Sequence, residues 1–159
     1  MLTFDVNKQT TMRFNYNDGG RSKYFKSQAG DCVCRSIAIT AGLDYMEVYN
    51  RLAEGNATQR QSKKQRTKTK GKNTASNGIY TKRKWFKDYM KELGFEWVSC
   101  MGIGTGCQVR LKEDELPNGK IICVVSKHYC AVVDGVINDT YDPSRDGTRC
   151  VYGYWKFVG

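Results

Sequence analysis

The sequence predicts an α+β protein in which N-terminal helices pack on a C-terminal antiparallel β-sheet. Apolar residues recur with a helical period of about 3.6 before position 93, and with a period of about two after position 95. Helices that precede a run of strands are typical of the α+β class. The 159 residues suffice for one compact domain, no internal repeat is visible, and we expect residues 1–159 to form a single domain.

Three segments have the pattern of amphipathic helices. They span 31–41, 44–56 and 81–93. Each begins at a residue that can cap a helix N-terminus and ends where glycine favours termination. The expected caps are Asp31, Asp44 and Thr81, and the expected ends are Gly42, Gly55 with Asn56, and Gly94.

Five later segments have the short apolar pattern of strands: 95–100, 121–126, 128–133, 136–139 and 150–158. Turns rich in glycine separate most of them. Asp134-Gly135 gives the strongest turn signal, because an Asp-Gly pair between two strands is typical of a two-residue hairpin. Nearer the N-terminus, Asn17 to Gly20 separates two aromatic pairs, and we expect it to form the tip of another hairpin.

Much of the positive charge is concentrated in one segment. The chain carries a net charge of +10, and residues 57–78 contain no periodic apolar residue. We expect a flexible surface loop there, because so little apolar surface cannot offset the cost of ordering. Its cations are Arg60, Lys63, Lys64, Arg66, Lys68, Lys70 and Lys72. They indicate either sequence-independent contact with nucleic acid or another acidic partner, or a solvated loop that keeps the protein soluble.

The sequence shows neither a membrane-spanning segment nor an export signal. No apolar run approaches the ~20 residues that a spanning helix needs, and the N-terminus lacks the apolar core of a signal peptide. We therefore expect a cytoplasmic protein that does not enter a membrane. Disulfides are rare in that compartment, so the seven cysteines are expected to be reduced thiols, with one or two of them reactive.

Cys32 and Cys34 are the candidate nucleophiles. A catalytic thiol needs a lowered pKa, and the free N–H groups and dipole of a helix N-terminus favour the thiolate. Cys32 directly follows the expected cap, whereas Cys34 lies on the apolar stripe with Ala38 and Ala41. Position alone therefore favours Cys32, and the alternative is that both are ordinary buried cysteines.

His128, the single histidine, is the candidate base. It opens the strand that turns at Asp134-Gly135, and a two-residue turn places it opposite Tyr141, with Asp139 as its diagonal neighbour. Asp139 is therefore expected to accept the Nδ1–H of His128 and to orient the ring towards the thiol. Asp142 is expected on the opposite face, and it is the alternative third residue if the strand bends.

A zinc site is a weaker interpretation. Cys32, Cys34, His128 and Cys130 have the chemistry of a Cys₃His ligand set. However, two cysteines separated by one residue on a helix point about 200° apart, so they cannot easily bind one ion. We expect no metal and no other cofactor.

The order of these residues resembles that of the papain-like cysteine peptidases. In that superfamily the cysteine begins an early helix, the histidine lies on a later strand, and an Asn or Asp follows on the next strand. Asp139-Thr140-Tyr141 is similar to the Asn-Ser-Trp segment that carries the third residue. The resemblance implies a papain-like fold with a Cys32-His128-Asp139 triad.

The chain is also similar to a group of uncharacterised phage and bacterial proteins with papain-like features. The shared segments are the helix start from Asp31 to Ser36, the stretch from His128 to Asp142, and the end from Arg149 to Trp155. Alignment with this group favours Cys32 as the nucleophile, and Tyr141 stands where the group usually has Trp. For a phage-encoded protein, the resemblance implies the host cytoplasm.

Papain itself has a glutamine six residues before its cysteine, and the side chain of that glutamine donates to the oxyanion. The resemblance gives this role to Gln28, which lies six residues before Cys34 but only four before Cys32. Either Cys34 is the nucleophile, or Gln28 reaches over a shorter loop, or another donor such as Ser27 serves.

The sequence thus predicts a cysteine hydrolase. Its substrate would be a protein or peptide, cleaved at a peptide, isopeptide or other amide bond by Cys32, His128 and Asp139. The alternative is a phage protein that binds nucleic acid without sequence preference on a catalytically degenerate papain-like fold. A cysteine-directed probe that locates the reactive thiol separates the two.

Overall fold

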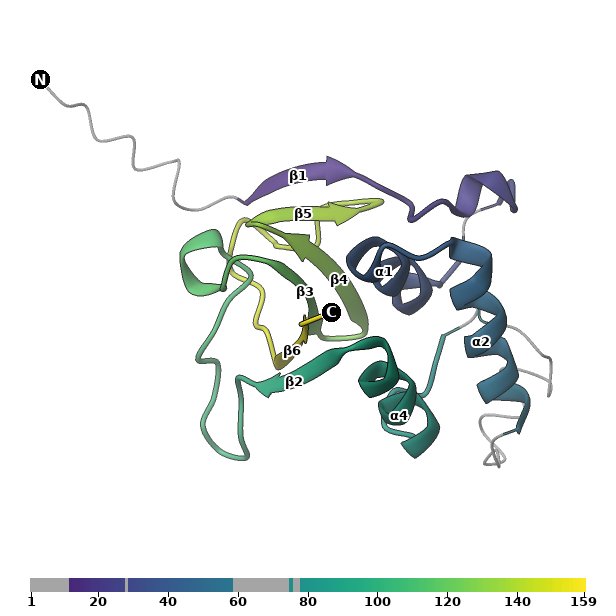
Figure 1. Cartoon of the computed structure of the whole chain (residues 1–159). Coiled ribbons are helices and arrows are strands. Elements are labelled where there is room, and N and C mark those ends of the chain that lie inside the picture. The colour runs from purple at the N-terminus through teal and green to yellow at the C-terminus, as the bar shows by residue number, and fades with distance from the viewer. Residues whose placement is uncertain (1–11, 28, 59–74, 76–77) are drawn as a thin grey trace, which may run out of the picture.

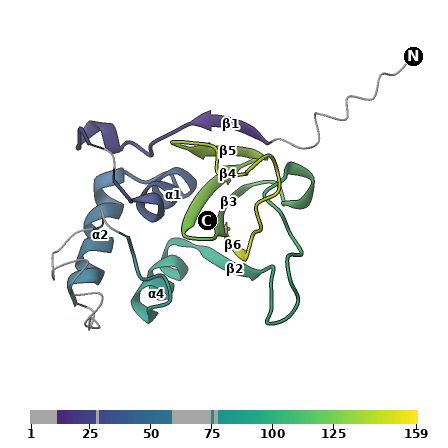
Figure 2. The ribbon, with the colours of Figure 1, turned by 180° about the vertical axis from the view of Figure 1, so that it is seen from behind.

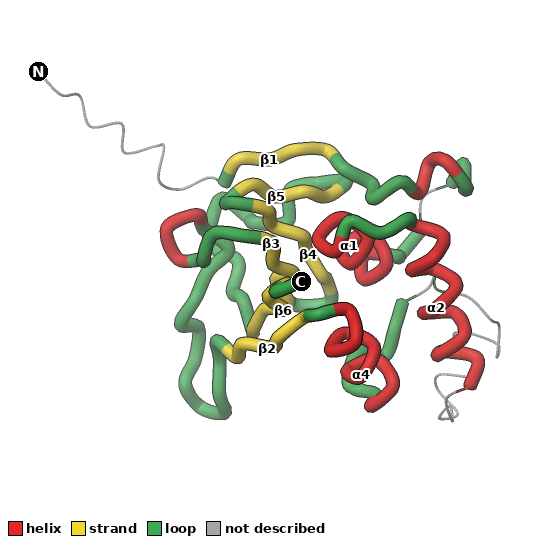
Figure 3. Tube along the Cα trace, viewed as in Figure 1, coloured by secondary structure: helices red, strands yellow, loops and turns green. Residues whose placement is uncertain are grey.

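The computed structural model describes residues 12–27, 29–58, 75 and 78–159 (Figure 1). These residues form an α+β arrangement, as predicted. The described helices are α1 (Cys32–Ala41), α2 (Tyr45–Thr58) and α4 (Lys84–Leu93), with two short 3₁₀ helices, η2 (Arg21–Lys23) and η3 (Glu113–Glu115). The described strands are β1 (Arg13–Tyr16), β2 (Phe95–Ser99), β3 (Lys120–Val125), β4 (His128–Val133), β5 (Val136–Asp139) and β6 (Gly153–Phe157). The three α-helices gather on one side of the strands (Figure 3).

The six strands form one mixed sheet in the order β1-β5-β4-β3-β6-β2, from top to bottom in Figure 1. Neighbouring strands are antiparallel except β1 and β5, which are parallel. The prediction of an antiparallel sheet is therefore wrong at this edge. The parallel pairing is compatible with the connection, because the chain passes through the helices and three other strands between β1 and β5.

The hairpin predicted around Asn17 to Gly20 does not form. Arg13–Tyr16 pairs with β5 instead, and the chain continues into the η2 turn. Asn17 and Asp18 hold the intervening turn, since their side chains accept the N–H groups of Gly19 and Gly20, each at 2.9 Å. Side chains of Asn and Asp compete in this way with strand pairing.

Both faces of the sheet bury apolar residues. Alternate residues of β3 point to opposite faces: Ile122 belongs to a cluster with Ile37 and the other helix residues, whereas Ile121 belongs to a second cluster. Leu111 and Val151 close this second cluster from the segments that flank β3 and β6. The view from behind in Figure 2 shows the helices again on one side of the sheet and these connecting segments on the other.

The helices lie close to their predicted positions. α1 ends before Gly42, whose φ of 66° is the left-handed conformation that glycine favours. α2 runs past its predicted end at Gly55 and continues to Thr58. Gly55 has no Cβ and so leaves space for the Trp85 ring, which a Cβ would approach to 2.3 Å. α4 begins after the predicted cap Thr81, because residues 80–83 form a hydrogen-bonded turn. No helix in the described part of the chain has the length and apolar content that crossing a bilayer requires.

The β4–β5 hairpin has the predicted two-residue turn. Asp134 and Gly135 have φ values of 48° and 80°, as a hairpin turn of this kind requires. Val133 pairs with Val136 across it. The predicted register is therefore confirmed, and it brings the first residue of β4 and the last residue of β5 to the same end of the sheet.

The prediction that all seven cysteines are reduced is wrong for one pair. Cys107 and Cys150 form a disulfide with their Cα atoms 5.8 Å apart, and the other five cysteines are free. The two segments lie side by side, since Arg110 and Cys150 form a β-bridge. Sequence spacing alone does not reveal which cysteines such a contact brings together.

The disulfide can be tested by counting the alkyl groups that the denatured protein takes up with and without reductant. Alkylation of the denatured protein should add five groups without reductant and seven after reduction. The Cys107→Ser variant is expected to lose about 4 kcal/mol of unfolding free energy, because the bond joins residues 43 positions apart and restricts the unfolded chain. Seven groups added without reductant would contradict the pairing.

Candidate active site

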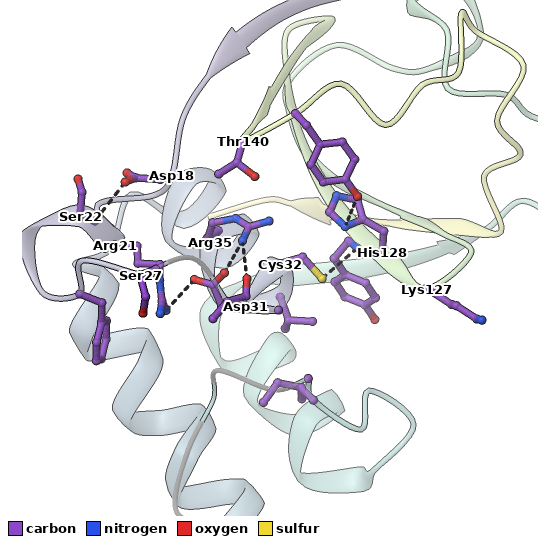
Figure 4. A pocket seen from close by; sticks show the side chains of 18 of the residues that line it. Asp18, Arg21, Ser22, Ser27, Asp31, Cys32, Arg35, Lys127, His128 and Thr140 are labelled. Carbon is purple, nitrogen blue, oxygen red and sulfur yellow. Dashed lines mark hydrogen bonds and ion pairs between the residues drawn. The ribbon is translucent and has the colours of Figure 1, made fainter. Parts of the chain in front are cut away.

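The structure brings the three predicted catalytic residues together at one end of the sheet. Cys32 is the first residue of α1, His128 the first of β4 and Asp139 the last of β5. One turn after Cys32, the hydroxyl of Ser36 donates to the backbone oxygen of Tyr129 at 3.1 Å. This contact holds the N-terminal turn of α1 against the start of β4, and Figure 4 shows the Cys32 and His128 side chains side by side.

His128 and Asp139 form a buried pair. The Nε2 atom of His128 lies 2.6 Å from Oδ2 of Asp139, and both residues are less than a tenth exposed. The sequence predicts Nδ1 as the partner, and this detail is wrong. Asp139 lies diagonally across the hairpin, and Nε2 is the nitrogen farther from the histidine backbone. Nδ1 lies instead 3.3 Å from the hydroxyl of Tyr141.

The surroundings of Cys32 favour its thiolate. Burial alone would raise the pKa of the thiol, but interactions led by the His128 side chain together outweigh burial and lower the pKa below its ordinary value. The N–H of Tyr129 donates to Cys32 Sγ at 3.5 Å, and the positive charge of Arg35 also lowers the pKa. A nucleophilic thiol needs this kind of setting.

The pKa of His128 moves in the complementary direction. Burial would lower it, but the hydrogen bond with Asp139 and the interaction with Cys32 outweigh burial and raise the pKa to about 9. A raised imidazole pKa beside a lowered thiol pKa means that each group favours the charged form of the other, as in a thiolate–imidazolium pair.

Cys34, the alternative nucleophile, lies in the core. It is fully buried, and its Sγ donates to the backbone oxygen of Tyr45 at 3.7 Å. Burial and the negative charge of Asp31 raise its pKa to about 12. Burial also raises the pKa of the remaining free thiols, Cys100, Cys123 and Cys130. Of the five free cysteines, all within the described residues, Cys32 alone has a lowered pKa.

Asp142, the alternative third residue, lies in the turn that follows β5. Its side chain is exposed, and its Oδ1 accepts the N–H of Ser144 at 2.9 Å. The two-residue hairpin explains why Asp139 is the carboxylate beside His128, because this turn sets the register of β5.

A buried charge network continues from Asp139, and the sequence did not predict it. Nη2 of Arg35 lies 3.3 Å from Asp139 Oδ1, and Nη1 of Arg35 binds Asp31. Asp31 also accepts from Arg21 at 3.2 Å and from the hydroxyl of Tyr45 at 2.5 Å. These charges are buried, so each depends on its partners. The one local signal is the four-residue spacing of Asp31 and Arg35 on a helix.

Asp31 therefore differs from the predicted helix cap. It precedes α1, but its side chain makes no capping hydrogen bond, because both carboxylate oxygens are bound within the network. The first backbone bond of α1 joins the N–H of Arg35 to the oxygen of Asp31 at 3.0 Å. The N–H groups of Cys32 and Val33 come before this bond, at the end of the helix where donors have no partner within the helix.

A cavity of about 700 Å³ opens over the thiol and the imidazole. Cys32, His128 and Tyr129 line it together with Arg21 and Ile79. Its size lies within the roughly 300–1,000 Å³ of pockets that bind small molecules. The thiol and the imidazole thus face the cavity, while Asp139 lies behind them, buried and outside its lining.

Several sequence predictions fall on residues outside the described ones. Gln28 and the cations from Arg60 to Lys72 lie there, so the oxyanion role and the basic loop stay predictions. The predicted boundaries of the loop, 57–78, are wrong at the start, because positions 57 and 58 continue α2. Ala75, within the same segment, is buried in the helix-side core.

The zinc interpretation finds no support in the geometry. Within the ranges that the structure describes, no three His, Cys, Asp or Glu side chains come together as metal ligands. Cys34 lies in the core whereas Cys32 lies beside His128, as expected for two cysteines separated by one residue on a helix.

A thiol, an imidazole and a carboxylate in contact recur in unrelated cysteine hydrolases. No family model, curated protein or solved structure matches the chain. The chemistry of the site is therefore inferred from its own residues and their contacts.

The carboxylate assignment predicts a change in the titration of the single histidine. Asp139→Asn should lower the pKa of His128 from about 9 towards or below its ordinary 6.5, because a neutral amide no longer stabilises the imidazolium. Proton NMR of the ring, free of overlap from other histidines, measures this directly. Asp142→Asn is the matched control and should leave the pKa near 9. A larger effect of Asp142→Asn would move the third catalytic role to that residue.

Proposed function

We propose that this protein is a cysteine hydrolase of the papain-like type, which cleaves a peptide, isopeptide or other amide bond with Cys32 as nucleophile. One observation carries the proposal: Cys32 is the free cysteine with a lowered pKa, and it lies beside a buried His128–Asp139 pair. Buried cysteines that serve only to fill a core have raised pKa values, as the other free thiols of this chain do.

Acylation begins from the thiolate–imidazolium pair. Cys32 Sγ attacks the carbonyl carbon, a C–S bond forms, and the carbonyl oxygen becomes an oxyanion. The N–H of Cys32, in the first turn of α1, is our proposed donor to this oxyanion. The imidazolium of His128 gives its proton to the leaving nitrogen, the C–N bond breaks, and an amine departs from a thioester.

Deacylation returns the enzyme to its starting state. The neutral imidazole accepts a proton from water, and the hydroxide attacks the thioester carbon. The C–S bond breaks, the carboxylic acid product leaves, and the thiolate and imidazolium are restored. Throughout the cycle, Asp139 holds the histidine ring through Nε2 and stabilises its charged form.

The order of elements supports the papain-like assignment. The thiol begins an early helix, the histidine begins a later strand, and the carboxylate ends the next antiparallel strand. The parallel strand β1 is the edge strand of the sheet and lies beside β5, outside these three elements. The nucleic-acid alternative depends on Arg60 to Lys72, outside the described residues, and no described contact favours it.

The proposal is tested with a reactive acyl ester and with mixed peptides. The wild type should release the ester's alcohol in a burst, carry the acyl group on Cys32 in intact-mass and peptide-mass spectra, and cleave amide bonds in the peptide mixture. Cys32→Ala should do none of these. Cys34→Ala is the matched control and should retain them, because Cys34 lies in the core. Equal turnover by wild type and Cys32→Ala, or none by wild type, would contradict the proposal.

A further inference from the structure

A second cavity, of about 600 Å³, is lined by His128 and by the turns before β4 and after β5. It shares His128, Tyr141 and Lys127 with the first cavity, but Cys32 does not line it. The Tyr141 ring packs against that of His128, with the two centroids 5.1 Å apart, and both rings line both cavities. The two cavities therefore meet at the catalytic imidazole.

The second cavity has an excess of positive charge. Of the described residues, Lys127, Arg145 and Arg149 line it against a single carboxylate, that of Asp142. The Asp142 carboxylate already accepts the N–H of Ser144 at 2.9 Å. An anion entering this cavity would meet unneutralised cations beside the reacting bond.

The cations are presented by ordered turns. Arg149 donates to the backbone oxygen of Ser126 at 2.5 Å and to that of Pro143 at 3.5 Å, so it ties the turn before β4 to the turn after β5. Its Nε–H is buried without a partner among the described residues. Arg145 has a φ of 51° in a turn closed by the N–H of Thr148 at 3.1 Å, which fixes the backbone of the arginine beside the cavity, whereas the hydrogen bonds of Arg149 fix its guanidinium. A fixed guanidinium loses little freedom when it binds a carboxylate.

The chemistry decides which part of a substrate reaches this cavity. The imidazolium gives its proton to the leaving nitrogen, so the leaving group departs on the histidine side of the thiol. The cavity that contains His128 but not Cys32 lies on that side. The acyl portion, in contrast, stays bonded to Cys32 in the first cavity.

We propose that the cavity lined by Lys127, Arg145 and Arg149 is a subsite for a carboxylate on the leaving group of the substrate. The leaving-group assignment rests on the proposed hydrolase function. The carboxylate has two sources, an acidic side chain shortly after the cleaved bond or the free C-terminus of a short peptide. Both present the same planar anion to the arginines.

Binding to Cys32→Ala tests the subsite without cleavage. Three fluorescent pools of short, otherwise neutral peptides are compared by anisotropy: one with an amidated C-terminus, one amidated with a single Glu, and one with a free C-terminal carboxylate. We expect at least one carboxylate pool to bind about three- to tenfold more tightly than the neutral pool, the size typical of contacts with exposed cations. The pool that gains identifies the source of the carboxylate.

Combining Arg145→Gln with Cys32→Ala should remove most of this preference. The substitution leaves Arg149 and its contacts with backbone oxygens in place. Arg110→Gln is the matched control, an exposed arginine that lines neither cavity, and should keep the preference. Equal binding of all pools, no binding, or a preference unchanged by Arg145→Gln would overturn the subsite. Ester turnover by the wild type reports separately on the hydrolase: a carboxylate preference without turnover overturns the hydrolase alone.

Discussion

Replacing Arg35 with methionine is expected to lower the free energy of unfolding by about 3–5 kcal/mol, the range seen when one partner of a buried ion pair is removed. Arg35 is 8 % exposed and binds the carboxylates of both Asp31 and Asp139. Without the guanidinium, Asp31 keeps Arg21 and Tyr45, but Asp139 keeps only His128 as a charged partner among the residues that the structure describes. Denaturant unfolding at neutral pH measures the loss.

The chain offers a matched control for this variant. Lys84 and Asp88 form an ion pair with the same four-residue helical spacing and a distance of 2.6 Å, but the lysine side chain is 89 % exposed. Lys84→Met should therefore change stability by less than about 0.5 kcal/mol. If Arg35→Met cost no more than Lys84→Met, the network between α1 and Asp139 would not stabilise the fold as described.

Replacing His128 with alanine is expected to have its largest effect on Cys32 reactivity at acidic pH. Without the imidazolium, the pKa of Cys32 should return towards or above that of an ordinary thiol, about 8.5. Below this value the thiolate fraction falls tenfold for each pH unit, so alkylation at pH 5 should slow by about tenfold or more. The difference should largely disappear near pH 9, since a thiolate of higher pKa is also the stronger nucleophile.

The raised pKa of His128 also makes the stability of the folded protein depend on pH. Its value of about 9 in the folded protein exceeds the ordinary 6.5, so protonation of the ring favours the folded state. This contribution is fully present below pH 6.5 and is lost as the pH rises through about 9. In His128→Ala it should be absent, so the difference in unfolding free energy between the two proteins should shrink as the pH rises from 6.5 to above 9 and become independent of pH beyond that. For the alkylation experiment, equal rates for the wild type and His128→Ala at pH 5 would contradict the proposed thiolate–imidazolium pair.

Local sequence signals predicted which side chains lie together at the centre of this candidate site. The Asp134-Gly135 turn fixed the register of β4 and β5, and the register fixed Asp139 as the neighbour of His128. The apolar stripe of the first helix likewise predicted that Cys34 points into the core and that Cys32 does not. In each case the deciding residues are close in sequence, and their geometry follows from one period or one turn type.

The features that the sequence did not predict depend on contacts between distant segments. β1 pairs with β5 across more than a hundred positions, and Arg35 reaches Asp139 from 104 residues away. The Cys107–Cys150 disulfide and the basic cavity at Arg145 likewise arise only when separate segments meet in the folded chain. Nothing in the spacing of these residues specifies such contacts before the topology is known.

The most direct test of the activated thiol is to locate the first cysteine that reacts. Native protein at pH 6 is treated with limiting iodoacetamide and digested, and the labelled residue is identified by mass spectrometry. Cys100 is the internal reference, a partly exposed free thiol whose pKa is raised by burial. We expect Cys32 to be labelled before Cys100 and before the three buried free thiols. Labelling of Cys100 or Cys34 ahead of Cys32 would contradict the account of Cys32 as the nucleophile.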